Sequence, residues 1–266
     1  MSEIPFFWVD AFTDRPFGGN PAAVCPLQAW LPDAVLQKLA WQHGLSETAF
    51  TVRLKSGAYQ LRWFTPEREV DLCGHATLAS AHVLINECGE SSPIRFESQS
   101  GPLSVSKNDL NRLVLNFPSR PPNELESPEQ YQGLLTALGV SNAVWVGKSR
   151  DFLVAFADES TVANISPDFQ KMVNFSSSSV IVTAPGDTCD FVSRNFAPGY
   201  GIDEDPVTGS AHCTLTPYWA EQLGKSELHA RQISARGGDL WCELMADERV
   251  AIAGNAVTYL RGTITM

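Results

Sequence analysis

Apolar residues occur in short runs along the chain, and turn-forming residues separate these runs. Runs of strand length occupy 6–12 and 22–27, and apolar residues recur at helical spacing within 32–44. Alternating runs at 48–54 and 58–66, separated by Lys-Ser-Gly, are typical of a β-hairpin. Further short strands are predicted at 93–98, 102–106 and 112–117. The first half therefore combines short strands with helices.

Residues 118–130 concentrate proline and polar residues without an apolar period, and this composition favours a linker. A boundary there divides the chain into halves of 1–118 and 119–266. The second half opens with a predicted helix at 127–139, whose first residues fit a capping box. Strands are then predicted at 143–147, 152–156, 179–183 and 190–196.

The two halves resemble each other in sequence. "RWFTP" at 62–66 and "RNFAP" at 194–198 each end a predicted strand. Gly74 begins an apolar helix shortly after the first motif, and Gly209 begins another shortly after the second. Each of these segments reaches a closing glycine after the same fifteen residues. We interpret this correspondence as a duplicated domain.

The helix after Gly74 is apolar nearly all round, which is typical of a buried helix. Its N-terminal end carries unpaired N–H groups and a partial positive charge. Glycine at Gly74 and Gly209 allows a ligand to approach the backbone closely. Two such helix ends that face one cleft would suit a small carboxylate substrate.

Composition narrows the range of partners. The 266 residues are 44% hydrophobic, as in a globular protein, and the net charge of -11 leaves no basic face for nucleic acid or for an anionic membrane surface. No apolar run is long enough for a membrane span or a secretory leader, so we expect a cytoplasmic protein. The six cysteines lack a C-x-x-C pair, which favours free thiols in a reducing compartment.

The segment "DLCGHATLASAHVL" places Cys73 and His75 at the start of the buried helix. A thiol there has a lowered pKa and can act as nucleophile or base, while a small buried cysteine at a turn is the structural alternative. A racemase with two thiols would need a second one at the equivalent position, which Thr208 occupies, so that mechanism is disfavoured. His75 is a candidate hydrogen-bond donor or proton relay, or else a structural cap.

A metal site built from Cys73, His75, His212 and Cys213 would lack the usual ligand spacings, so we expect no metal. Glu47 in "LSETAF" follows a helix end and precedes small and aromatic residues. A carboxylate packed against such neighbours is suited to general acid–base chemistry, whereas a solvated turn glutamate is the alternative.

Acidic residues also precede the second helix start, in "GIDEDPVTGSAH". Carboxylates at this place complement the helix dipole without any catalytic purpose. One of them could instead hold a substrate amine or orient His75.

Four motifs together carry a family resemblance: "DAFTDRPFGGNPAAVC", "LSETAFT", "RWFTPEREVDLCGHATLASAHVL" and "GIDEDPVTGSAHC". The chain resembles the phenazine-biosynthesis PhzF-like isomerases, relatives of diaminopimelate epimerase and proline racemase. The resemblance implies an α+β diaminopimelate epimerase-like fold, with two pseudo-symmetric domains that each wrap a curved sheet around a central helix. It also implies a site in the cleft between them, and a last strand at 256–266 that completes the first domain.

The same resemblance implies roles for individual residues. The catalytic glutamate of the family falls on Glu47, its histidine on His75 and its aspartate on Asp205. The resemblance also implies that the reaction needs no cofactor. Its substrate-binding groups fall on Gly74, Gly209 and Ser210. Family members often have alanine where this chain has Cys73, which is the position of the thiol base in the epimerase relatives. Cys73 is therefore a candidate substrate-binding residue. Its thiol also keeps a thiol-dependent activity as an alternative.

The sequence favours an isomerase that moves a proton between carbons of a small carboxylate-bearing substrate, with Glu47 as general acid and base. One alternative is a racemase or epimerase for amino acids that uses Cys73 and needs no pyridoxal phosphate. Another is a non-catalytic module that binds a metabolite or a protein. A homodimer is expected only from the frequency of dimers among soluble proteins.

Overall fold

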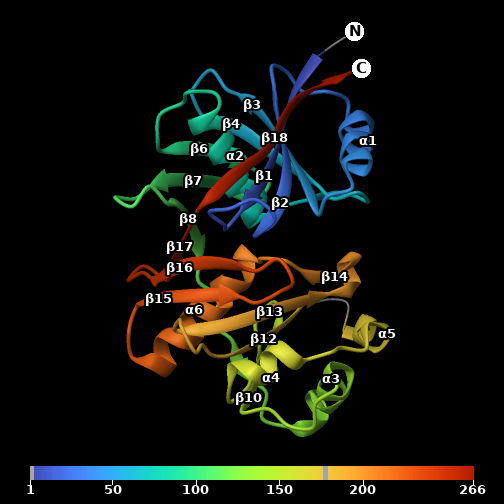
Figure 1. Cartoon of the computed structure of the whole chain (residues 1–266), viewed down its shortest axis with the longest axis vertical. Helices are drawn as coiled ribbons and strands as arrows, with labels where there is room; N and C mark the ends of the chain where they lie inside the picture. The colour runs from blue at the N-terminus through green and yellow to red at the C-terminus, as the bar shows by residue number, and fades with distance from the viewer. Residues whose placement is uncertain (1–2, 176–178) are drawn as a thin grey trace. The chain divides into compact units, whose positions relative to one another are not determined.

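The computed structural model describes residues 3–175 and 179–266, and the chain divides into two compact units. Unit 1 comprises residues 1–116 and 253–266, and unit 2 comprises residues 117–252. Both termini belong to unit 1, where the last strand lies beside the first (Figure 1). The chain passes from unit 1 to unit 2 near residue 117 and returns to unit 1 for its last strand.

Unit 1 consists mainly of strands, with two helices. Its elements in chain order are β1 (Glu3–Ala11), β2 (Asn20–Leu27), α1 (Asp33–His43), β3 (Glu47–Arg53), β4 (Tyr59–Phe64), β5 (Glu69–Val70), α2 (Gly74–Asn86), β6 (Ile94–Ser98), β7 (Gly101–Lys107), β8 (Leu113–Pro118) and β18 (Ala256–Thr265). The predicted hairpin is confirmed, since β3 and β4 pair antiparallel. The predicted end of the first helix is also confirmed, since Gly44 adopts the left-handed conformation (φ 64°) after α1.

The sheet of unit 1 alternates antiparallel pairs with parallel pairs that are joined through helices. β18 and β2 flank β1 antiparallel, and β2 then runs parallel to β3 after the crossover helix α1. β4 runs parallel to β6 after α2, and β7 and β8 continue antiparallel. Strands from both ends of this order contact α2, so the sheet curves around the helix (Figure 1). Eleven of its thirteen residues are buried, as expected for a central helix.

Unit 2 contains more short helices than unit 1. Its elements are β9 (Asn123–Glu124), η1 (Pro128–Gln130), α3 (Gln132–Leu138), β10 (Trp145–Lys148), β11 (Phe152–Ala155), α4 (Glu159–Asn164), α5 (Phe169–Met172), η2 (Val173–Phe175), β12 (Val180–Pro185), β13 (Phe191–Ala197), η3 (Pro198–Tyr200), β14 (Ile202–Asp205), α6 (Gly209–Leu223), β15 (Glu227–Gln232), β16 (Gly238–Leu244) and β17 (Arg249–Gly254). None of the helices in the described part of the chain is long and apolar enough to cross a membrane.

The strand connections of unit 2 repeat those of unit 1. β11 runs parallel to β12 across α4 and α5, and β12 pairs antiparallel with β13. β13 then runs parallel to β15 across α6, and β15 pairs antiparallel with β16. This series matches β2, β3, β4, β6 and β7, so that α6 is the counterpart of α2. The repeat inferred from the sequence is thus visible in the topology.

A repeated ion pair clamps the short strand that precedes each central helix. In unit 1, Arg62 Nε and Nη2 donate to both carboxylate oxygens of Glu69 at 2.7 and 2.6 Å. In unit 2, Arg194 donates in the same way to Glu204 at 2.8 and 2.9 Å. Glu69 lies in β5 and Glu204 in β14, and each is paired with the strand of its arginine. The clamp therefore fixes the chain where it approaches the helix start.

The helix predicted at 127–139 is wrong as a single helix. A 3₁₀ turn, η1, is followed by α3, and Tyr131 between them leaves helical geometry (φ -133°, ψ -5°) and packs against the apolar core of unit 2. The capping interaction at its start does form, because the Ser127 N–H donates to Gln130 Oε1 at 3.4 Å.

The segment predicted as a linker forms a hydrogen bond to α6, at a carbonyl that the internal proline of this helix leaves without a helical donor. Pro217 has no N–H, so the carbonyl of Cys213 lacks the helical donor that residue 217 would otherwise supply. The N–H of Arg120 takes that place and donates to the Cys213 carbonyl at 2.9 Å. The interior proline of α6 thus leaves no orphaned carbonyl, because the chain entering unit 2 satisfies it.

Candidate active site

Glu47 is the first residue of β3, beside Ala22 in the parallel strand β2. Three buried residues follow it, Thr48, Ala49 and Phe50, and the Glu47 side chain itself is only 15% exposed. Glu47 is therefore held on a strand at the edge of the core of unit 1, and the alternative of a solvated turn residue does not apply.

The start of α2 brings Cys73 and His75 close to this carboxylate. Cys73 is the cap residue, with extended backbone (φ -144°, ψ 117°), and its side chain makes no capping hydrogen bond. Its carbonyl instead accepts from the N–H and the hydroxyl of Thr77, at 3.2 and 2.5 Å. Gly74 is the first helical residue, and His75 is buried in the first turn. The thiol and the imidazole are thus placed by the same helix end.

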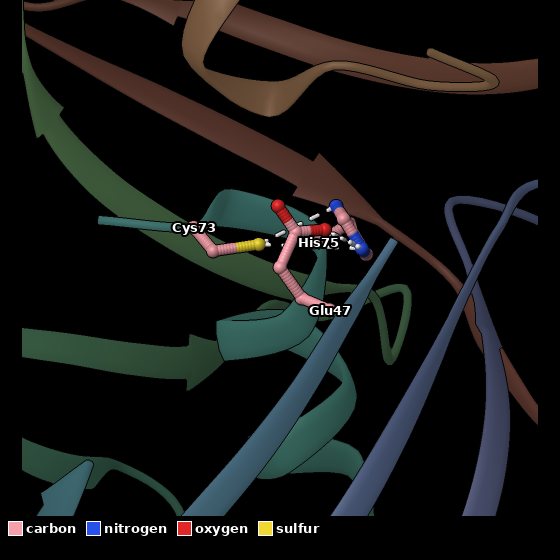
Figure 2. A group of neighbouring side chains, drawn as sticks. All are labelled: Glu47, Cys73 and His75. Carbon is pink, nitrogen blue, oxygen red and sulfur yellow. Dashed lines mark hydrogen bonds and ion pairs between the residues drawn. The ribbon is translucent and has the colours of Figure 1, made fainter. Parts of the chain in front are cut away.

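The three side chains form a compact group (Figure 2). His75 Nε2 lies 3.3 Å from Glu47 Oε2, and Cys73 Sγ lies 3.5 Å from His75 Nδ1. The imidazole therefore stands between the thiol and the carboxylate, with one ring nitrogen toward each.

Burial keeps this imidazole uncharged. Loss of solvent around the ring lowers the pKa of His75 to about 3. A neutral imidazole carries one N–H donor and one acceptor nitrogen, so it can accept from one neighbour while it donates to the other. The chain from Cys73 through His75 to Glu47 can therefore pass a proton without forming a buried imidazolium ion.

The counterpart of this helix end in unit 2 contains Asp205, Gly209 and Ser210. Asp205 ends β14, and its Oδ2 accepts from the Thr208 hydroxyl at 2.5 Å. Gly209 and Ser210 begin α6, and Thr208 is the cap residue in the place that Cys73 holds in unit 1. The structure thus brings Glu47, Cys73, Gly74 and His75 together in unit 1, and groups Asp205, Gly209 and Ser210 at the start of α6.

Two residues near α6 were missed by the sequence analysis. The side chain of Gln232 accepts from the Thr208 N–H and donates to the Asp205 carbonyl, each at 2.7 Å, and it is buried. Arg150 Nη2 donates to the Ser210 hydroxyl at 3.4 Å and pairs with buried Asp151 at 2.9 Å. No local motif marks either residue, because both reach the helix start from distant segments.

The four residues of the metal set that the sequence analysis considered lie at or within two different helices, α2 and α6. His212 and Cys213 lie inside α6 in unit 2, where His212 Nδ1 is 2.9 Å from the carbonyl of Thr208. In unit 1, Glu47 completes a different group with Cys73 and His75, whose potential ligand atoms all lie within 4.8 Å of one another.

Two similar units, each with a curved mixed sheet around a buried helix, define the class as the diaminopimelate epimerase-like fold. A solved probable proline racemase from Agrobacterium radiobacter K84 shares this fold with a TM-score of 0.64 at 9% identity, over 99% of this chain and 92% of that chain. The sequence profile of the phenazine biosynthesis-like (PhzC-PhzF) family matches residues 9–262, and the chain belongs to this family.

Two relatives show how fully the family covers the chain. An uncharacterized isomerase of Pseudomonas aeruginosa is 51% identical over 98% of this chain and 99% of its own. The crystal structure of a phenazine biosynthesis protein of the PhzF family from Enterococcus faecalis superposes with a TM-score of 0.94, at 46% identity and over the whole of both chains. The predicted fold and the predicted class, an isomerase of this family, are thereby confirmed.

Proposed function

We propose that this chain isomerises a small carboxylate-bearing substrate without a cofactor, by moving a proton from one carbon to another through Glu47. The observation that carries the proposal is the contact of 3.3 Å between Glu47 and the buried, neutral His75 at the start of α2. A carboxylate at the edge of a core, with an imidazole neighbour that stays uncharged, is suited to accept a proton and to return it.

The proposed reaction conserves atoms and charge. Glu47 takes a proton from a carbon next to an electron-withdrawing group, and the electron pair of the broken C–H bond moves into the adjacent unsaturated system. The carboxyl group then returns the proton to a second carbon on the same face, and the double bond shifts. His75 would hold the carboxyl in position through its ring nitrogen in both protonation states of Glu47.

Backbone N–H groups at the start of α2 would stabilise the negative charge that develops on the substrate. The first turn of this helix contains no acidic residue, so its partial positive charge is not offset by a side chain of its own. Gly74 lets the substrate approach these N–H groups, and Cys73 borders the same end. This placement favours a carboxylate or an enolate-like oxygen at the helix start.

The start of α6 offers polar groups of its own, to which the family resemblance assigns substrate binding. Ser210, with Arg150 3.4 Å from its hydroxyl, offers a polar group supported by a cation, and Gly209 is the first residue of the helix. Asp205 is oriented by Thr208 and is proposed to assist by holding a polar substituent of the substrate.

The proposal is tested by solvent deuterium incorporation into a panel of small amino, hydroxy and unsaturated carboxylic acids. Wild-type protein should exchange a carbon-bound proton of at least one acid. Glu47→Gln keeps the size of the side chain but removes the base, and should reduce that exchange by at least about 10²-fold. Glu67→Gln, at an exposed glutamate after β4, is the matched control and should exchange normally. Normal exchange by Glu47→Gln would show that the mechanism is wrong.

A further inference from the structure

Glu47, Cys73 and His75 present three different metal-ligating atoms to one small volume (Figure 2). Cys73 Sγ lies 4.0 Å from His75 Nε2, and that nitrogen lies 3.3 Å from Glu47 Oε2. All three atoms are within 4.8 Å of one another. The group combines a thiol, an imidazole and a carboxylate, which are the ligand types that proteins use for Zn²⁺.

The spacing is close to that of a tetrahedral zinc site. Bonds of about 2.3 Å to sulfur and about 2.0–2.2 Å to nitrogen and oxygen give ligand separations of roughly 3.3–3.6 Å at tetrahedral angles. The separation between nitrogen and oxygen already has this value, and the separation between sulfur and nitrogen exceeds it by less than half an ångström. The separation between the sulfur and the carboxylate oxygen is bounded only at 4.8 Å, so the Cys73 and Glu47 side chains would rotate to bring it into this range.

The charges of the group also suit a divalent cation. An imidazole ligand binds a metal through a ring nitrogen that carries no proton. The Cys73 thiol would release one proton on binding, and the resulting thiolate and the Glu47 carboxylate would balance the two charges of the cation. Both Cys73 and His75 are buried, which strengthens their attraction to a bound cation.

The equivalent place in unit 2 provides a built-in comparison. There the cap residue is Thr208, the next side chain is Ser210 and the nearby acid is Asp205, so neither a thiol nor an imidazole occupies the corresponding positions. Hydroxyl and carboxylate groups prefer hard cations, whereas sulfur and imidazole select zinc and similar metals. Of these two helix starts, the one at α2 has the soft ligand set.

We propose that Glu47, Cys73 and His75 form a three-ligand site for a thiophilic divalent cation such as Zn²⁺, with the fourth position open. The cation would occupy the atoms that exchange protons, so its binding would reversibly inhibit the isomerase. The inhibition rests on the proposed function, whereas the binding does not. Mg²⁺ and Ca²⁺, which prefer oxygen ligands, would not compete at similar concentrations.

The test uses the full-length protein, freed of metal with a chelator and then titrated with Zn²⁺ by calorimetry. Co²⁺ serves as a spectroscopic substitute, because a bound thiolate produces a charge-transfer band in the near ultraviolet. Cys73→Ser removes the sulfur with little change in size. Cys88→Ser removes an exposed thiol just beyond α2 and is the matched control. Unfolding midpoints of all variants establish that each one is folded.

We expect one equivalent of Zn²⁺ to bind to wild-type protein and to Cys88→Ser with the same affinity. Cys73→Ser should lose the Co²⁺ charge-transfer band and bind Zn²⁺ more than about 100-fold more weakly, beyond the usual effect of changing an outer-shell partner. Glu47→Gln should weaken binding at least about tenfold but keep the band. The site is refuted by absence of binding, by unchanged binding in Cys73→Ser or Glu47→Gln, or by loss of binding in Cys88→Ser.

These outcomes are separate from those that test the isomerase. Metal binding is measured without substrate, and deuterium exchange is measured in the presence of a chelator. Exchange that depends on Glu47 together with no Zn²⁺ binding would refute only the metal site. Zn²⁺ binding together with normal exchange by Glu47→Gln would refute only the proton-transfer mechanism.

Discussion

The starts of α2 and α6 have the same architecture and different chemistry. Each helix follows a short strand clamped by an arginine–glutamate pair, and each begins with glycine after an extended cap residue. In unit 1 the cap is Cys73 and the residue after glycine is His75, whereas in unit 2 these positions are Thr208 and Ser210. Duplication therefore preserved the backbone that presents a helix end, while the side chains around each end diverged.

The side chains at the start of α2 include titratable groups in contact with one another, whereas those at the start of α6 are held by several hydrogen bonds. His75 lies between a thiol and a carboxylate and stays neutral. Thr208 and Asp205 are bound to each other and to the buried side chain of Gln232. The first arrangement suits proton transfer, and the second suits a rigid binding surface. Each prediction below tests this contrast.

The largest difference is expected between substitutions at the equivalent positions 75 and 210. His75→Gln removes the imidazole that lies 3.3 Å from Glu47 Oε2 and should lower the rate of deuterium exchange by about 10- to 100-fold, because the base is then less well positioned. Ser210→Ala removes one neutral hydroxyl and should lower that rate by less than about tenfold. Equal losses, measured at saturating substrate, would mean that the two helix ends contribute alike.

The two arginine clamps should differ in their contribution to stability. Arg194 is 13% exposed and also donates to the Ile165 carbonyl at 2.7 Å, just after α4. Arg62 is 22% exposed, and its further partner Asp33 is largely in solvent. Arg194→Met should therefore lower the free energy of unfolding by about 3 kcal/mol, and Arg62→Met by about 1 kcal/mol. Urea denaturation measures both, and the reverse order would contradict the burial argument.

Histidines buried in the two units should make stability fall with acidification. Burial lowers the pKa of His75 to about 3 and that of His212 to about 4, from an ordinary value of 6.5. Below pH 6.5 the unfolded chain binds protons that the folded chain does not, so the free energy of unfolding decreases down to these folded pKa values.

The slope should be up to about 1.4 kcal/mol per pH unit for each such histidine. Urea midpoints between pH 7 and pH 5 measure it, and His75→Gln should reduce the slope by one such contribution. A variant with the full wild-type slope would show that His75 is not held neutral in the folded protein.

The smallest effect is expected at the proline that only α6 contains. An interior proline ordinarily costs a helix about 3 kcal/mol. Here the Arg120 N–H already satisfies the Cys213 carbonyl, so Pro217→Ala should change the free energy of unfolding by less than about 1 kcal/mol. Thermal or urea unfolding measures this difference. A gain of several kcal/mol would mean that the Arg120 contact does not compensate for the missing helical donor.

Much of the fold could be predicted from local patterns. The β3–β4 hairpin, the C-terminal end of α1 at Gly44 and the paired helices from Gly74 and Gly209 follow from alternation, turn residues and equal spacing. The strands β15 to β17 were not predicted, because charged residues and glycines interrupt their apolar alternation. Tyr131 broke a predicted helix because a tertiary contact outweighed local propensity.

The site could be predicted only in part, because several of its contacts join residues that are far apart in the sequence. Equal spacing within the repeat pointed to Gly74 and Gly209, and the family resemblance pointed to Glu47, His75 and Asp205. The contact between Glu47 and His75 joins the start of a strand to the start of a helix, and no periodicity encodes it. Gln232 and Arg150 were missed because their contacts with α6 depend wholly on tertiary structure.

We propose that proton transfer belongs to the start of α2 and not to its counterpart at α6. The most direct test compares the rates of solvent deuterium incorporation for Glu47→Gln and Asp205→Asn with that of wild type, on an acid that the wild type exchanges. We expect Glu47→Gln to lose at least about 10²-fold, while Asp205→Asn keeps a clearly measurable rate. A rate for Glu47→Gln near that of wild type, or a larger loss for Asp205→Asn, would contradict the account.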